Sequence, residues 1–228
     1  MNCLLVAATP FEIAPFLDKW GGNGGAARNG EPPRKGDPPL PELDILVSGI
    51  GLTAATWSIT RQLQLKKYDW AIQAGIAGCF NRQLPLGSVV SIGHDSIADQ
   101  GVLENKRFNT VFDMKLAPEN RHPYKKGWLP NPHRGLLKKA GLKPVKGISV
   151  NEITSSRARI ALLEEKYQPV TESMEGAAFH YACLMEGVPF VQVRSLSNYI
   201  GERNKARWKM KEAIIQLNAV IEALMSEV

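Results

Sequence analysis

Two glutamates in this sequence are suited to acid-base or hydroxyl-binding chemistry. Glu12 follows an apolar run and the pair Thr9-Pro10, and Glu175 lies just before a helix of small apolar residues. A partly buried glutamate can act as a general base, and a carboxylate can also hold hydroxyl groups. Helix N-termini favour acidic side chains for structural reasons as well, so helix capping is an alternative role for Glu175.

A third group of polar residues follows an apolar run near the carboxyl end of the chain. Residues 189–193 are mostly apolar, and Arg194, Ser197 and Asn198 come directly after them. Polar side chains buried without partners are costly, so these residues are either paired or exposed in a cleft. Ligands bind at the carboxyl ends of strands in α/β sheets, which favours a cleft. A turn led by Asn198 is the alternative.

Two glycine-containing segments follow predicted strands. Residues 49–54 match the pattern GxGxxA, and Asp69 lies twenty residues after Gly49. In a dinucleotide-binding fold this acidic residue closes the next strand, whereas Asp69 precedes it, so a tight turn near a ligand or a helix is the better interpretation. Residues 74–78, AGIAG, allow either close approach of a ligand or close helix packing.

Strands and helices alternate along the chain, and the polar residues lie where they meet. Strands are predicted at 2–8, 43–49, 70–75, 87–93, 146–150 and 189–197, and helices at 54–67, 133–140, 155–166, 174–186 and 204–226. Another helix begins at Pro10 with Thr9 as its cap, which places Glu12 in the first turn. This order predicts an α/β protein with a central sheet flanked by helices. The Gly- and Pro-rich stretch 20–41 is expected to be a flexible loop.

The composition predicts one soluble, cytoplasmic domain. The 228 residues are 44% hydrophobic, which suffices for one sizeable core. The amino terminus has no basic signal region, and no segment reaches the length of a membrane span, so no membrane partner is expected. Cys3, Cys79 and Cys183 match no disulfide or metal spacing and are expected to be buried free thiols. The histidines show no ligand spacing either, and no metal is predicted.

Positive charge is concentrated in residues 106–146. This stretch holds eleven Lys and Arg residues against Asp113 and Glu119, in a chain of net charge +6. Such a surface can meet an anion. It lacks the aromatic spacing of RNA-stacking modules and any zinc-finger or heptad pattern, so nucleic acid is not the expected partner. A non-catalytic nucleotide or RNA binder is the alternative of a different class.

Five segments taken in order resemble the purine nucleoside phosphorylase and nucleosidase superfamily. They are VAATPFE at 6–12, SGIG at 48–51, AGIAG at 74–78, SMEGAA at 173–178 and VRSLSN at 193–198, and the resemblance extends over residues 3–222. It implies a single three-layer α/β domain over residues 1–228 with a mixed, partly barrel-like sheet. It also implies a purine nucleoside as substrate, no cofactor, and a homo-oligomer that is a dimer or larger.

The resemblance assigns roles to residues of this sequence. Glu12 is implied to orient and deprotonate a water molecule, and Glu175 to hold the ribose hydroxyls. Arg194 is implied to organise the water side, and Asn198 to contact N7 of the purine with support from Ser197. Further substrate-binding positions are implied at Ile50, Ile76, Ala77, Gly78, Asn151 and Met174.

Two departures from the superfamily pattern narrow the expected reaction. Its phosphorylases hold phosphate with arginines and with a serine in the glycine loop, where this chain has Ile76. Ile76 cannot bind phosphate, Gln73 brings no charge, and Glu12 would repel the anion, so hydrolysis is favoured.

Asn198 is the second departure. Adenine-specific nucleosidases of the superfamily carry aspartate at this position. An asparagine amide complements a 6-oxo group and a protonated N7, which points to a 6-oxopurine nucleoside. Within the superfamily the chain is most similar to the futalosine hydrolases, which release hypoxanthine from futalosine in menaquinone biosynthesis. A methylthioadenosine/adenosylhomocysteine nucleosidase and a 6-oxopurine nucleoside phosphorylase are the alternatives.

Overall fold

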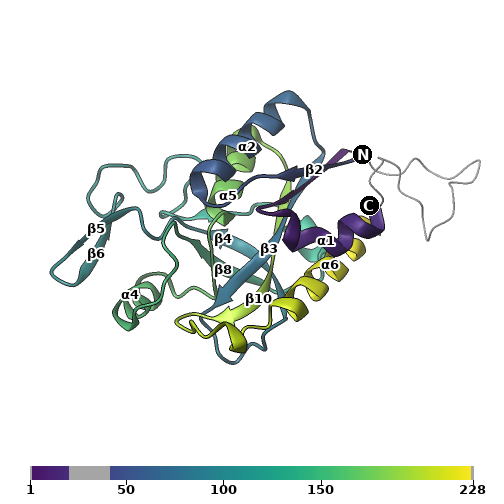
Figure 1. The fold of residues 1–228 in the computed structure, drawn as a ribbon. Coiled ribbons are helices and arrows are strands. Elements are labelled where there is room, and N and C mark those ends of the chain that lie inside the picture. Colours follow the sequence, from purple (N-terminus) through teal and green to yellow (C-terminus); the bar gives the residue numbers. More distant parts are fainter. Residues whose placement is uncertain (1, 21–41, 227–228) are drawn as a thin grey trace, which may run out of the picture.

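The fold is built on a mixed sheet that closes into a barrel at one side. The computed structural model describes residues 2–20 and 42–226 (Figure 1). The sheet runs in the order β10-β4-β8-β9-β3-β1-β2, and β10 also pairs with β3. The expected flexible loop at 20–41 lies outside the described residues, apart from Trp20 at its start.

Five strands form the closed ring. They are β3 (Trp70–Cys79), β10 (Phe190–Tyr199), β4 (Val89–Asp95), β8 (Pro144–Ser149) and β9 (Thr171–Ser173). β3 pairs in parallel with β10 and antiparallel with β9. This long strand therefore joins the two outer strands of the series β10-β4-β8-β9 and closes the ring. Among the remaining pairs, β4–β8 and β8–β9 are parallel and β10–β4 is antiparallel. The α/β class and the mixed, partly barrel-like sheet predicted from the sequence are confirmed.

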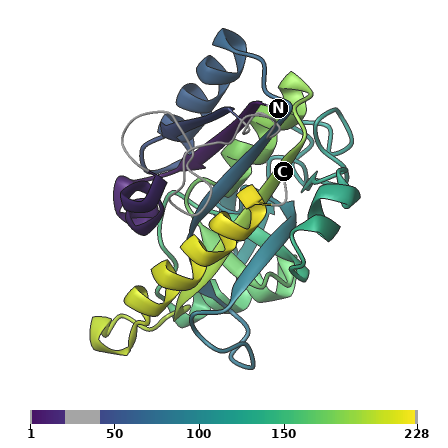
Figure 2. The same cartoon turned by 90° about the vertical axis from the view of Figure 1, so that its right-hand side faces the viewer.

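The sheet extends beyond the barrel through two parallel strands, β1 (Asn2–Ala7) and β2 (Glu42–Val47). β1 is apolar on both faces because both faces are covered. Its side chains Leu4 and Val6 join one core cluster with helices α2 (Leu52–Leu65) and α5 (Gly176–Glu186). Leu5 and Ala7 join a second cluster with α1 (Pro10–Trp20) and α6 (Met210–Ser226). Helices therefore cover both faces of the sheet, and Figure 2 shows α6 lying over the strands.

The segment 101–146 contains more regular structure than expected. A hairpin of β5 (Gly101–Glu104) and β6 (Arg107–Thr110) projects from the rest of the protein in Figure 1. The short strand β7 (Leu129–Pro130) pairs with β4, and α3 (Arg134–Lys139) is the short helix predicted at 133–140. Helix α4 (Arg157–Tyr167) matches the helix predicted at 155–166 to within two residues at each end.

Three boundaries differ from the prediction for identifiable reasons. β3 was expected to end at Gly75 but continues to Cys79, because β9 and β10 pair with its second half. Helix α5 begins at Gly176 because residues 171–173 form strand β9. Residues 205–207 form a 3₁₀ turn, η1 (Lys205–Arg207), so the last helix begins at Met210.

Two expectations from composition can be compared with the described residues. Cys3, Cys79 and Cys183 are all buried and free, as predicted. No helix within residues 2–20 and 42–226 is long and apolar enough to span a membrane.

Candidate functional site

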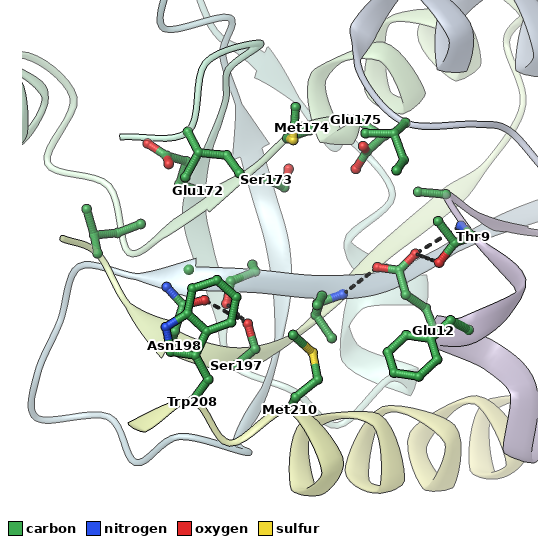
Figure 3. Close-up of a pocket in the computed structure, with 18 of the residues that line it drawn as sticks. Thr9, Glu12, Glu172, Ser173, Met174, Glu175, Ser197, Asn198, Trp208 and Met210 are labelled. Carbon is green, nitrogen blue, oxygen red and sulfur yellow. Dashed lines mark hydrogen bonds between the residues drawn. The ribbon is translucent and has the colours of Figure 1, made fainter. Parts of the chain in front are cut away.

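A cavity of about 290 Å³ opens where α1 begins and where β3, β9 and β10 end (Figure 3). This position follows the rule that ligands bind at the carboxyl ends of strands in α/β sheets. Nine of the predicted site residues line it, and they come from segments far apart in the chain: Glu12, Ile50, Ile76, Ala77, Gly78, Met174, Glu175, Ser197 and Asn198.

Glu12 is held in place by hydrogen bonds to both of its carboxylate oxygens. The N–H of Ile76 donates to Oε1 at 3.0 Å, and the N–H of Thr9 donates to Oε2 at 3.2 Å. Helix α1 begins at Pro10 as predicted, and the Thr9 hydroxyl donates to Oε2 of Glu12 at 3.5 Å. Burial raises the pKa of Glu12, and the nearby Arg194 and the Ile76 N–H offset part of that rise. A glutamate with a raised pKa is suited to proton abstraction near neutral pH.

Glu175 stands at the N-cap position of α5 but does not cap this helix with its side chain. Its Oε1 accepts a hydrogen bond of 2.9 Å from the N–H of Gly51. Gly51 has a φ of 88°, a conformation that favours glycine, and this explains the glycine-containing turn after β2. Oε2 of Glu175 lies 3.8 Å from Nη1 of Arg194. The structure therefore gives Glu175 an environment that helix capping alone does not explain.

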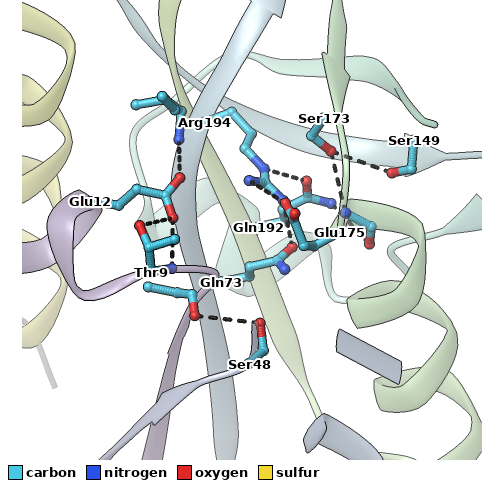
Figure 4. A network of polar contacts seen from close by, with 12 residues as sticks. Thr9, Glu12, Ser48, Gln73, Ser149, Ser173, Glu175, Gln192 and Arg194 are labelled. Carbon is cyan, nitrogen blue, oxygen red and sulfur yellow. Dashed lines mark hydrogen bonds and ion pairs between the residues drawn. The ribbon is translucent and has the colours of Figure 1, made fainter. Parts of the chain in front are cut away.

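Arg194 is fully buried behind the pocket in a network of side-chain contacts (Figure 4). Its Nε donates to Oε1 of Gln192 and its Nη2 to Oε1 of Gln73, both at 2.9 Å. A Cβ on Gly75 would collide with Nη1, so glycine at this position leaves room for the guanidinium. Arg194 thus does not line the pocket, and it acts on the site through the charge that it places beside Glu12 and Glu175.

Asp95 is a buried carboxylate that is linked to Arg194 through Gln192 and does not line the pocket. Its Oδ2 accepts a hydrogen bond from Nε2 of Gln192 at 3.1 Å, and its Oδ1 accepts from the Ser149 hydroxyl at 3.0 Å. Because the Gln192 amide donates to Asp95, its oxygen is turned toward Arg194. Burial raises the pKa of Asp95 to about 6, against the lowering effect of its hydrogen bonds and of Arg194. The sequence contained no spacing that singled out Asp95, Gln73 or Gln192 as parts of one network.

Ser197 and Asn198 lie together at one end of the pocket. The Ser197 hydroxyl is 2.9 Å from Oδ1 of Asn198 and 3.3 Å from the backbone oxygen of Ala77. Nδ2 of Asn198 donates to the backbone oxygen of Tyr199 at 3.2 Å. The Asn198 amide is thus oriented by the residues on either side of it. Its second N–H and the second lone pair of Oδ1 remain for a ligand.

Asn151 is the other predicted site residue that does not line the pocket. It is exposed, and its N–H donates to the carboxylate of Asp99 at 2.6 Å. The residue that reaches the pocket from this segment is Ile153, two positions later.

Several lining residues had no role predicted from the sequence: Ala8, Thr9, Phe11, Ile153, Ser173, Ile200, Trp208 and Met210. Glu172 and Arg203 also line the pocket. Phe11 lies within the motif at 6–12, which was an available signal for it, whereas Trp208 lies ten residues after the motif at 193–198. Met210 reaches the pocket because the chain from Gly201 to Lys209 returns to it, and the Lys209 N–H donates to the Ser197 oxygen at 2.8 Å. Within the described ranges, no three His, Cys, Asp or Glu side chains are grouped so as to hold a metal ion.

Comparison with known proteins identifies a family over almost the whole chain. A family model described as the Phosphorylase superfamily matches residues 4–226. A futalosine hydrolase from Streptomyces coelicolor is 30% identical over 188 residues, which cover 79% of this chain and 77% of the relative. A futalosine hydrolase from Thermus thermophilus is also 30% identical, over 80% of each chain.

Solved structures show the same fold. A 5'-methylthioadenosine/S-adenosylhomocysteine nucleosidase from Helicobacter pylori superposes with a TM-score of 0.80 at 17% identity, covering 100% of this chain and 99% of that one. The futalosine hydrolase of Helicobacter pylori gives a TM-score of 0.78 at 18% identity, covering 100% and 98%. With a family model spanning nearly all of its length, this chain belongs to the Phosphorylase superfamily.

Proposed function

We propose that this protein hydrolyses the N-glycosidic bond of futalosine and releases hypoxanthine, as a step of menaquinone biosynthesis. The main support for hydrolysis, as opposed to phosphorolysis, is the charge of the pocket. Among the described residues that line it, Glu12, Glu172 and Glu175 are acidic and Arg203 alone is basic. Such a pocket repels a phosphate ion and suits water as the nucleophile. Two relatives that are 30% identical carry the name futalosine hydrolase.

The geometry supports a division of tasks within the pocket. Cleavage of an N-glycosidic bond develops positive charge on the ribose and negative charge on the leaving base. Glu12, fixed by Ile76 and Thr9, takes a proton from the attacking water. Glu175 accepts from the ribose hydroxyls on its free lone pairs, and Met174 packs against the sugar. Ser197 and Asn198 lie at the end of the pocket that we assign to the purine.

The preference for a 6-oxopurine rests on Asn198. An asparagine amide can donate to O6 and accept from a protonated N7, whereas adenine offers a donor in place of O6. Ser197 holds the oxygen of this amide at 2.9 Å. Methylthioadenosine/adenosylhomocysteine nucleosidase activity is the second candidate, because a nucleosidase of that name shares the fold.

We also propose that the protein is a homo-oligomer in the cytoplasm. Large apolar side chains are exposed on the edge strand β2, in the turn after it and on helix α2: Ile45, Val47, Ile50 and Trp57. A second copy of the chain would cover such a surface. Three buried free cysteines suit a reducing compartment. Sedimentation at several protein concentrations tests the assembly, and a monomer at every concentration would contradict it.

A substrate comparison tests the proposed activity. The protein is incubated with futalosine, inosine and methylthioadenosine, each with and without phosphate, and free base is measured by chromatography. We expect hypoxanthine from futalosine at a rate that does not depend on phosphate. Adenine from methylthioadenosine without hypoxanthine from futalosine would support the second candidate instead, and strict phosphate dependence would identify a phosphorylase.

A further inference from the structure

Asp95 is a fully buried carboxylate to which the mechanism above gives no task. It is 1% exposed, and the groups that donate to it are neutral. Its Oδ1 accepts from the N–H of Ser96 at 2.8 Å and from the Ser149 hydroxyl at 3.0 Å. Its Oδ2 accepts from Nε2 of Gln192 at 3.1 Å. A buried carboxylate is costly without such donors, and these contacts also determine how each donor is oriented.

The side-chain amide of Gln192 has one allowed orientation between Asp95 and Arg194. An ionised carboxylate only accepts hydrogen bonds, and a guanidinium only donates them. Gln192 therefore presents its NH₂ group to Asp95 and its oxygen to Nε of Arg194, at 2.9 Å. The reversed amide would place oxygen against oxygen on one side and N–H against N–H on the other. The charge of Asp95 thus sets the acceptor that Arg194 meets.

This acceptor is one of two that fix the guanidinium of Arg194 (Figure 4). Oε1 of Gln192 holds Nε, and Oε1 of Gln73 holds Nη2 at 2.9 Å. The third nitrogen, Nη1, lies 3.8 Å from Oε2 of Glu175. The charge of Arg194 also lowers the pKa of Glu12 against the effect of burial. Two amide oxygens thus direct the positive charge toward the two carboxylates of the site.

Gly176 leaves the space that this network needs at the start of α5. A Cβ at this position would collide with Oδ2 of Asp95 and with Oε1 of Gln192. The network also reaches the first turn of the helix, because the hydroxyl of Ser149 accepts from the N–H of Ala177 at 2.7 Å. Asp95 is therefore connected both to the arginine and to the helix that begins at the pocket.

We propose that Asp95 is a positioning residue, which through Gln192 holds the guanidinium of Arg194 beside Glu12 and Glu175. The inference rests on the proposed function, in which Glu12 activates water. A positive charge fixed beside Glu12 favours its ionised form, which is the form that accepts the proton. A displacement of such a group by about 1 Å is enough to cost on the order of 100-fold in rate. Asp95 does not line the pocket, so its effect passes through Arg194.

Replacing Asp95 by asparagine reverses the polarity of the network with little change of shape. The two donors at Oδ1, Ser96 and Ser149, keep the amide oxygen of the variant on their side, so its NH₂ group faces Gln192. The amide of Gln192 then turns, and its own NH₂ group meets Nε of Arg194. At pH 8, kcat on futalosine is expected to fall about 10- to 100-fold. The affinity for hypoxanthine, measured by calorimetry, should stay within about threefold, because the base end of the pocket is unchanged.

A second substitution restores the polarity and serves as the rescue. In Asp95→Asn/Gln192→Glu, the new carboxylate accepts from the asparagine amide with one oxygen and from Arg194 with the other. We expect kcat to return to within about threefold of that of the unmodified protein. In an Arg194→Met background, where no guanidinium remains to be positioned, Asp95→Asn should lower kcat by less than about twofold. Absence of rescue, or a loss in this background as large as in the unmodified protein, would overturn the proposal.

The position of Arg194 can also be followed without a substrate. Protein labelled with ¹⁵N-arginine gives Nε–H signals for its ordered arginines, and the signal absent from Arg194→Met identifies Arg194. Because this N–H is buried and bonded to Gln192, its hydrogen should exchange slowly with water. We expect exchange at least about tenfold faster in Asp95→Asn and restored protection in Asp95→Asn/Gln192→Glu. Asp18→Asn, the same change at an exposed position of α1, is the control and should leave the exchange rate unchanged.

The outcomes separate this inference from the proposed function. Exchange of the Arg194 Nε–H at an unchanged rate in Asp95→Asn would refute the role of Asp95 and leave the proposed function standing. Absence of hypoxanthine release by the unmodified protein would refute the proposed function, and the exchange measurement would still decide whether Asp95 holds Arg194. If Asp95→Asn does not fold, as judged by circular dichroism, Gln192→Met takes its place, because it removes the link between the two residues. An unchanged exchange rate in that variant would refute the proposal.

Discussion

The backbone N–H of Ile76 donates a hydrogen bond of 3.0 Å to Oε1 of Glu12, across 64 positions of the chain. This contact joins the first turn of α1 to the second half of β3, which reaches the pocket only because β3 continues past Gly75. Where a phosphorylase of the superfamily is implied to use a serine against phosphate, this chain uses the backbone of Ile76 to orient a carboxylate. The same position therefore orients the carboxylate that we propose as the base that activates water.

Replacing Glu12 by glutamine is expected to remove the general base with little change of shape. The variant should lose a factor of about 10² to 10⁴ in kcat on futalosine, the usual contribution of a positioned general base. Its affinity for hypoxanthine, measured by calorimetry, should stay within about threefold, because Glu12 lies away from the base end of the pocket. Turnover close to that of the unmodified protein would exclude Glu12 as the base.

The activity is expected to depend on pH through the ionisation of Glu12. Burial raises the pKa of this group, and Arg194 lowers it. Since the base must be ionised, kcat/KM should fall below a pH that lies above the ordinary glutamate value of about 4.3. In Arg194→Met this acid limb should move to higher pH, because the favourable charge is gone. A profile whose acid limb stays in place would contradict the electrostatic role of Arg194.

Changing Asn198 to aspartate is expected to alter the choice of base. An aspartate accepts from the 6-amino group of adenine and no longer donates to O6 of hypoxanthine. The kcat/KM ratio of futalosine to its 6-amino counterpart should fall by about 10- to 100-fold, corresponding to one or two polar contacts. Ser195→Ala, which removes a buried hydroxyl bonded to the Gly87 oxygen, is the control and should leave the ratio unchanged. An unchanged ratio in Asn198→Asp would remove Asn198 as the selecting residue.

Asp95 is expected to make stability depend on pH between about 4 and 6. Its pKa is about 6 in the folded protein and near 3.8 when exposed, so the folded state binds more protons in this window. As the pH rises through this window, the free energy of unfolding therefore falls by an amount on the order of 3 kcal/mol. Asp95→Asn has no carboxyl group at this position and lacks this pH dependence. The free energy of unfolding of the variant, minus that of the unmodified protein, should therefore increase from pH 4 to pH 6 and then level off.

Urea unfolding at several pH values measures this difference. Asp18→Asn, on the exposed side of α1, serves as the control and should show a constant offset. If the difference in free energy of unfolding is constant with pH for Asp95→Asn as well, then folding does not raise the pKa of Asp95.

Most of the fold could be predicted because its strands and helices are strongly patterned. The apolar run of β1, the Thr9-Pro10 start of α1 and the alternation of later elements predicted the α/β class. Strand β9 was missed because three residues, one of them Glu172, are too short to show a period of two. The hairpin β5–β6 was missed because the whole stretch 101–146 is polar, basic and rich in proline.

The pocket could be predicted as far as its residues lie in recognisable motifs. Nine predicted residues meet there, because each stands at a strand end or a helix start. Gln73, Gln192 and Asp95 come together through pairing of β3, β10 and β4, and no local pattern shows that three strands meet around Arg194. Trp208 and Met210 enter through the return of residues 201–209, whose course depends on the tertiary contact between Lys209 and Ser197.

The central claim is that water, and not phosphate, cleaves the glycosidic bond of a 6-oxopurine nucleoside in this pocket. The most direct measurement is the release of hypoxanthine from futalosine in phosphate-free buffer, with the sugar product identified by mass spectrometry. The account predicts stoichiometric hypoxanthine and a free sugar that carries a hydroxyl at C1'. Release only after phosphate is added, with a sugar 1-phosphate as product, would contradict it.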